Sequence, residues 1–160
     1  MTTLETVHIM LDYNYALHRR LWDSIDTLSR AQFQREINYS RGSLHNHMLH
    51  IASVDRRWLH GLRELPDVGH LKAEDYPNRE SVHIVFDSVM KDVIAYTAGL
   101  REDELEKTPA SLPGPRWQVL LHLVNHGTDH RAQVLRILND FGAPTFDQDF
   151  ILWMMKQSRD

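Results

Sequence analysis

The residues best suited to chemistry in this sequence are its histidines, of which there are 11 among 160 residues. Two of them, His126 and His130, are four positions apart in a stretch with helical periodicity, so both imidazoles lie on one face, a turn apart. Both rings can then reach one metal ion, and histidine is the commonest metal ligand. Spacing alone is weak evidence, because this composition gives roughly 0.7 such pairs by chance and two occur, counting His122–His126.

The neighbours of this pair indicate that both histidines lie in a core. They share one helical stripe with four apolar residues, Val119, Leu123, Val134 and Ile137. Two polar residues, Asn14 and His18, interrupt a similar stripe near the N-terminus. Buried imidazoles need partners for both ring nitrogens. Hydrogen-bonded core histidines and a shared metal ion both satisfy that need, and the residues alone leave the two interpretations open.

A third ligand could come from residues 44–62, which carry His45, His47 and His50. Periodicity slightly favours His47, which lies about 40° from Ile51 at the centre of the apolar stripe, whereas His50 lies about 100° away. His45 is expected to point outward. His122 flanks the other stripe and is expected in the core or beside the ligands. The remaining histidines are expected to be solvated: His8, His60, His70 and His83.

The periodicity of apolar residues predicts helices and no strand. The expected helices cover, approximately, residues 3–28, 44–62, 80–100, 116–141 and 147–156. The connection 63–79 is long and contains Pro66, Gly69 and Pro77, which favours a crossover over an up-down-up-down arrangement. We therefore expect an all-α fold in which residues 1–160 form a single domain. It is a four-helix bundle with a long crossover between helices two and three, plus a short C-terminal helix.

Composition excludes several classes of function. The absence of cysteine rules out disulfides, thiolate ligands and a cysteine nucleophile, and it is typical of a reducing cytoplasm. A net charge of -4 offers no basic surplus for nucleic acid. No apolar run approaches the ~18 residues of a membrane span, and the N-terminus lacks the apolar stretch of a signal peptide. We expect a cytoplasmic protein whose partners are neither nucleic acids nor membranes.

Two segments resemble the DinB/YfiT-like family of metal-dependent enzymes. The run His126-Gly-Thr-Asp-His-Arg-Ala-Gln133 is similar to the C-terminal signature of that family. Residues 43–58 resemble its second-helix motif, in which an acid and a tryptophan follow the ligand histidine at five and eight places. Asp55 and Trp58 hold those places, so the resemblance selects His50 over His47. Residues 12–21 are also similar to the family's first helix.

The resemblance implies a DinB-like bundle, usually dimeric, with a divalent metal ion held by His50, His126 and His130. Zinc or nickel is expected, with manganese and iron as alternatives. The sequence departs from the family pattern at Ala132, where glycine is frequent, and at His18, where asparagine is common. The second departure could add a ligand or a proton carrier to the pocket.

Three imidazoles leave at least one coordination position open, which is typical of catalytic rather than structural zinc. The resemblance therefore implies a metal-dependent enzyme: a transferase that uses a low-molecular-weight thiol, or a hydrolase of a small molecule. His18 is expected to carry a proton, with Asn14 or Arg131 orienting the substrate. The alternative is a non-enzymatic protein in which metal stabilises the bundle or senses stress. A homodimer is expected from the resemblance and from the apolar C-terminal segment.

Overall fold

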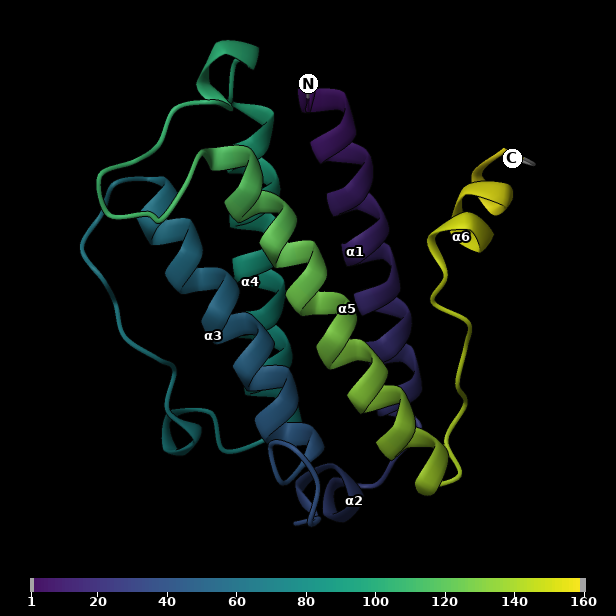
Figure 1. The fold of residues 1–160 in the computed structure, drawn as a ribbon. Coiled ribbons are helices and arrows are strands. Elements are labelled where there is room, and N and C mark those ends of the chain that lie inside the picture. Colours follow the sequence, from purple (N-terminus) through teal and green to yellow (C-terminus); the bar gives the residue numbers. More distant parts are fainter. Residues whose placement is uncertain (1, 159–160) are drawn as a thin grey trace.

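Four long helices run side by side in the computed structural model, which describes residues 2–158 (Figure 1). They are α1 (Leu4–Asp26), α3 (Leu44–Leu62), α4 (Arg79–Ala98) and α5 (Arg116–Asp140). The shorter elements are α2 (Arg30–Gln34), α6 (Phe150–Gln157) and two 3-10 turns, η1 (Ala73–Asp75) and η2 (Glu102–Glu104). The described residues contain no strand, so the all-α prediction is confirmed. The sequence analysis missed α2, and it started the C-terminal helix three residues early.

The direction of the helices explains the long connection. In Figure 1, α1 and α5 descend from the end of the bundle near the N-terminus, whereas α3 and α4 ascend towards it. Around the bundle, α5 contacts α1 and α3, and α4 contacts α3 and α1. Because α3 and α4 are parallel neighbours, the chain between them has to return along the whole bundle. Residues 63–78 make this predicted crossover.

Side chains of α3 hold the crossover in place. The Ser53 hydroxyl accepts a hydrogen bond from the backbone N–H of Leu71 (2.9 Å). His45 donates from Nε2 to the carbonyl of Tyr76 (2.6 Å) and is 8 % exposed. The expectation that His45 points outward is therefore wrong. Its position faces solvent only if the crossover is left out, and sequence periodicity does not show which faces a long connection will cover.

A polar layer divides the apolar core into two clusters. On α1 the clusters meet around His18, on α3 around Asp55, and on α5 between Val124 and Val134. Six buried polar or charged residues lie on this layer or border it: Asn14, His18, His47, Asp55, His130 and Arg131. Since burying polar groups is unfavourable unless they find partners, a layer of this size has to be satisfied internally or by a ligand.

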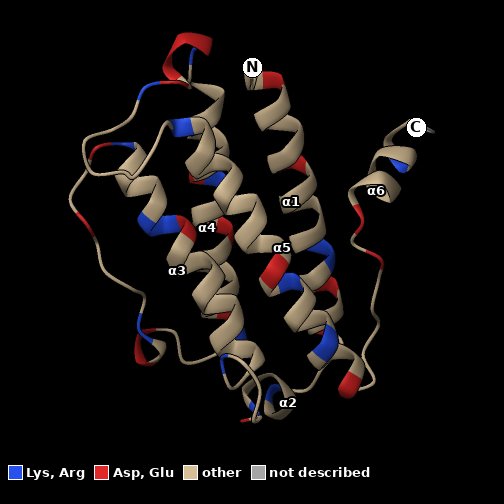
Figure 2. Ribbon diagram, in the orientation of Figure 1, with Lys and Arg blue, Asp and Glu red and all other residues tan. Residues whose placement is uncertain are grey.

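Charged residues of both signs occur on each of the four long helices. In the view of Figure 2, acidic and basic residues are interspersed along the helices and connections, without a continuous basic face. Within the part of the chain that the structure describes, no helix combines the length and apolar character that crossing a membrane requires.

Gly127 allows α1 and α5 to approach closely. A Cβ at this position would collide with Asn14 Oδ1 and would lie 3.0 Å from Cε1 of His18, both of which are fully buried. We expect Gly127→Ala to lower the free energy of unfolding by about 1–3 kcal/mol, as overpacking does. Urea denaturation measures the change. Gly99→Ala is the control, because a Cβ there meets only backbone oxygens at 3.6–3.7 Å. Equal stability of both variants would contradict the close approach.

The C-terminal helix is the basis for our expectation of a homodimer. Phe146, Phe150 and Trp153 pack against the bundle, but Ile151 and Met155 on α6 are 59 % and 49 % exposed. Exposed apolar side chains of this size on one short helix favour association. We propose a two-fold dimer that involves this helix. Sedimentation at micromolar concentration should give a dimer for the wild type and a shift towards monomer for Ile151→Ser/Met155→Ser.

The matched control for that experiment is Ile84→Ser, which removes an equally exposed isoleucine from α4 (64 % exposed) and should leave the dimer intact. A monomeric wild type would refute the dimer. Loss of the dimer only in the Ile84 variant would place the interface on α4 instead.

Candidate metal centre

Three histidines from two helices meet where α3 contacts α5. His50 of α3 and His126 and His130 of α5 each offer a ring nitrogen, and these nitrogens lie within 4.8 Å of one another. Nε2 of His50 is 3.2 Å from Nε2 of His126. Two bonds of about 2.1 Å to a common ion can span that separation. Among residues 2–158 this is the one cluster of three or more histidines and acids with the spacing of a metal site.

His47 has a different role. Its side chain is fully buried, and Nδ1 donates a hydrogen bond to the carbonyl of Ser43 (2.7 Å). Its ring centroid lies 6.3 Å from that of His130, compared with 4.6 Å for His50. Periodicity correctly placed His47 in the core. The histidine that joins His126 and His130 lies instead at the half-buried flank of α3. It is His50, the residue that the family register selected.

The cluster is electrically neutral, which is the form that binds metal. Burial, followed by the charge of Arg41, lowers the pKa of His50 to about 3. Burial and the neighbouring His130 lower the pKa of His126 to about 4, and burial also lowers the pKa of His130. Nδ1 of both His126 and His130 is buried without a hydrogen-bond partner among the described residues. Neutral rings with unsatisfied nitrogens form a donor set suited to a borderline divalent ion.

Behind the cluster, the three residues predicted to assist catalysis lie together between α1 and α5. Arg131 is fully buried and donates from one nitrogen to the side chain (2.5 Å) and the backbone carbonyl (3.2 Å) of Asn14. The same nitrogen lies 3.4 Å from Nε2 of His18. Burial and then the charge of Arg131, with smaller effects of His126 and His130, hold the pKa of His18 well below its usual value.

The rest of the Arg131 guanidinium is also satisfied by neutral acceptors. It donates to the hydroxyl of Thr128 (3.0 Å) and to the side-chain oxygen of Gln148 (3.2 Å). Because His18 and Asn14 are fully buried and engaged here, the structure places them behind the histidine cluster rather than on the outer surface.

A buried acid completes the polar layer. Asp55 accepts a hydrogen bond from the hydroxyl of Tyr15 (3.1 Å), and its other oxygen has no partner among the described residues. Burial raises the pKa of Asp55 to about 7, although the hydrogen bond from Tyr15 and the charge of Arg131 act in the opposite direction. The acid that fixed the motif register is therefore part of the core network and not a metal ligand in this cluster.

Sequence reasoning missed Arg41, which contacts the cluster directly. Its guanidinium donates to Nε2 of His50 (3.1 Å) from the loop before α3. The available signal was its place, next to a glycine and the N-cap serine of the helix that carries His50. His122, by contrast, is exposed rather than in the core, with its ring 5.2 Å from that of Trp58 and 5.8 Å from that of His126.

Two hollows share Trp58 as a lining residue, and neither is lined by a histidine of the cluster. One, of about 350 Å³, is lined by residues that include Val54, Arg57 and His70, and the other, of about 240 Å³, is shared with His122. His122 connects the second hollow to the cluster, because its ring lies 5.8 Å from that of His126, and this hollow offers space for the apolar part of a small molecule.

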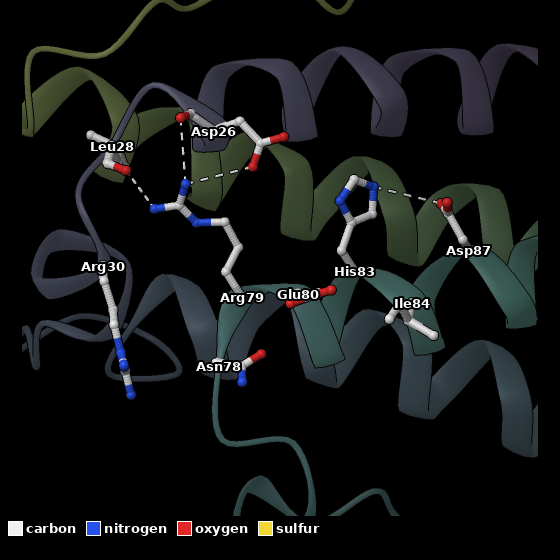
Figure 3. Close-up of a pocket in the computed structure, with 9 residues that line it drawn as sticks. All are labelled: Asp26, Leu28, Arg30, Asn78, Arg79, Glu80, His83, Ile84 and Asp87. Atoms are coloured by element: carbon white, nitrogen blue, oxygen red, sulfur yellow. Dashed lines mark hydrogen bonds and ion pairs between the residues drawn. The ribbon is translucent and has the colours of Figure 1, made fainter.

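A third hollow of about 680 Å³ lies at the other end of α1 and carries no comparable cluster (Figure 3). There the guanidinium of Arg79 is directed at the backbone carbonyl of Leu28 (2.5 Å), and His83 faces Asp87 (3.7 Å). His83 also stacks on Trp22, so it is not simply solvated. This hollow lacks a group of three or more histidines and acids with metal-site spacing among the described residues, so the histidine cluster of α3 and α5 is the candidate site.

Comparison with known proteins identifies one family. The family model described as DinB family matches residues 1–159. A search of the curated proteins finds no match.

The raised pKa of Asp55 predicts a pH-dependent stability. Because folding favours the protonated acid, its contribution is complete below the usual pKa of about 3.9 and is lost as the pH rises through 7. Asp55→Asn lacks this loss. The unfolding free energy of the variant minus that of the wild type should therefore increase by about 1–4 kcal/mol between pH 5 and pH 8.

Urea denaturation at several pH values tests this difference. Asp92→Asn, which changes a half-exposed carboxylate on α4, should give a curve parallel to the wild type. A parallel curve for Asp55→Asn as well would show that Asp55 is ionised throughout this range.

Proposed function

The chain belongs to the DinB family, and we propose that it is a metal-dependent enzyme that binds one divalent ion through His50, His126 and His130. One observation carries the proposal. The cluster holds three neutral imidazoles and no carboxylate among the described residues, and two of the three rings are only partly buried. Three protein ligands leave a position for a substrate, as in catalytic sites, whereas structural zinc sites are closed by four.

Zinc or nickel suits this donor set best. Imidazole nitrogen is a good ligand for both, whereas manganese prefers oxygen donors, which the cluster lacks among the described residues. Manganese is therefore disfavoured, whereas iron, which imidazole also binds, stays an alternative.

We propose that the reaction is transfer to a low-molecular-weight thiol or hydrolysis of a small molecule. When bound, the ion would supply a Lewis acid that lowers the pKa of a thiol or polarises a carbonyl. Trp58 and the hollows beside it would hold the apolar part of the substrate. His18 is the proposed proton carrier: burial and the charge of Arg131 lower its pKa, so it would pass a proton on rather than hold one. Asn14 and Arg131 would orient His18 from behind the proposed ligands.

An activity assay tests the enzyme class. Protein loaded with zinc or nickel is mixed with a small thiol and an aromatic chloride as electrophile, and in parallel with an activated ester. Thiol transfer or ester hydrolysis that disappears in His126→Ala/His130→Ala supports the proposal. A loaded protein that turns over neither substrate, but unfolds at a higher temperature than the metal-free form, would instead favour a stabilising role for the metal.

Metal content provides the direct prediction. Purified wild type should carry close to one divalent ion per chain, and His126→Ala/His130→Ala should carry almost none, because two of three ligands are lost. Elemental analysis decides this. Equal and negligible metal in both proteins would end the proposal.

Single substitutions on α3 then test the ligand register. His50→Ala should weaken metal binding by orders of magnitude, whereas His47→Ala should change it by at most about tenfold, as losses near a metal site do. Competition with a chelator measures both dissociation constants. The reverse ranking would make His47 the ligand.

A further inference from the structure

Arg41 occupies a position that concerns the metal directly. Its guanidinium donates to Nε2 of His50, the same nitrogen that faces His126. Since arginine can only donate, this contact uses the lone pair of His50 Nε2. A metal ion that binds through that nitrogen needs the same lone pair, so Arg41 and the ion compete for one atom.

The loop around Arg41 is fixed on both sides. Its backbone carbonyl accepts a hydrogen bond from the side chain of Asn46 on α3 (3.1 Å). The hydroxyl of Ser40 is hydrogen-bonded to the side chain of Gln133 on α5. Ser40 and Gly42 both have a positive φ, of 47° and 84°, so the chain turns sharply on each side of Arg41. The loop thus spans the two helices that carry the histidines, and an arginine displaced from His50 remains beside the cluster.

Arg41 has no acid within ion-pairing distance among the described residues, although the Glu36 carboxylate lies against the neighbouring Gly42. Arg41 takes part in none of the ion pairs between described residues. Burial has the largest effect on the pKa of His47, His50, His126 and His130, and the charge of Arg41 lowers each of them further, so it acts on the whole cluster.

The acid that faces the cluster is Asp129. It raises the pKa of His126 and His130 and accepts a hydrogen bond from Gln133 (3.1 Å). One carboxylate cannot offset both a divalent ion and a guanidinium. With three neutral ligands, the loaded site would keep a surplus of positive charge, and such a surplus favours an anionic ligand.

We propose that Arg41 is the anion-binding residue of this site: metal binding displaces its guanidinium from His50, and it then holds a small anionic ligand, such as a carboxylate or thiolate, beside the ion. This inference rests on the proposed metal site and specifies the charge of the substrate group that binds there. Arginine suits this role because its planar donor group matches carboxylates and remains charged.

The first test is the metal affinity of the full chain. Arg41→Met removes the competing donor and the repelling charge, so zinc should bind about tenfold or more tightly than in the wild type, the equivalent of one charged hydrogen bond. Arg136→Met is the matched control, because it removes an exposed cation of α5 that is already paired with Asp140. Circular dichroism checks that each variant is folded. Unchanged zinc affinity in Arg41→Met would overturn the competition.

The second test measures anion binding through the absorption spectrum of the cobalt(II)-loaded protein, with acetate and thiocyanate as probes. Both anions should perturb the spectrum of the wild type. Their affinity should fall about tenfold or more in Arg41→Met, the loss of a charge-assisted contact, and should be largely retained in Arg41→Lys and Arg136→Met.

The outcomes separate the two proposals. Equal anion affinity in the wild type and Arg41→Met would overturn the role of Arg41 while leaving the metal site intact. An equal loss in Arg136→Met would assign the effect to net charge and would also overturn it. A wild type that binds neither zinc nor cobalt would overturn the metal site itself, and this inference with it.

Discussion

The buried guanidinium of Arg131 constrains the whole molecule. A charge without solvent access is tolerated only when its donors are satisfied, and removing it from water costs several kcal/mol. Here the partners come from three separate parts of the chain: Asn14 on α1, Thr128 on α5, and Gln148 in the segment before α6. One side chain therefore links α1, α5 and the C-terminal segment, and Gly127 provides the room that the close approach of α1 and α5 requires.

The same constraint positions the three histidines proposed as metal ligands. His130 is next to Arg131 in sequence, and His126 lies one turn earlier on the same helix, so fixing the guanidinium against α1 fixes how far both imidazoles project towards α3. From the flank of α3, the side chain of His50 then reaches both imidazoles. The polar layer weakens the core as a source of stability, because it separates two apolar clusters. The hydrogen bonds of this layer also support the histidines from behind, because they are directional whereas apolar contacts are not.

The sequence predicts what depends on periodicity and misses what depends on the crossover and the loops. Apolar spacing located all four long helices, and the Pro- and Gly-containing connection predicted the crossover. The two histidines of α3 show the limit of periodicity. Periodicity identifies the centre of a buried face, where His47 lies. A residue proposed to share an ion with another helix lies at the edge of that face, and only the family register indicated His50. The prediction that His45 points outward was wrong because the crossover covers that face of α3. Arg41 was missed because its side-chain direction depends on two residues with positive φ.

The distribution of charge around the histidines gives them a consistent chemical character. Arg131 lies behind the cluster and Arg41 in front of it, while the buried Asp55 has its pKa raised towards neutrality and so offsets little of this charge. Burial does most to lower the pKa of His50, His126 and His130, and the charge of Arg41 lowers each pKa further, so all three imidazoles resist protonation. Nitrogens kept neutral in this way remain available as metal ligands, and the field that suppresses protonation also opposes the entry of a cation. If the site binds a divalent ion as proposed, an anion beside Arg41 would offset this field, and the binding of the two would be coupled.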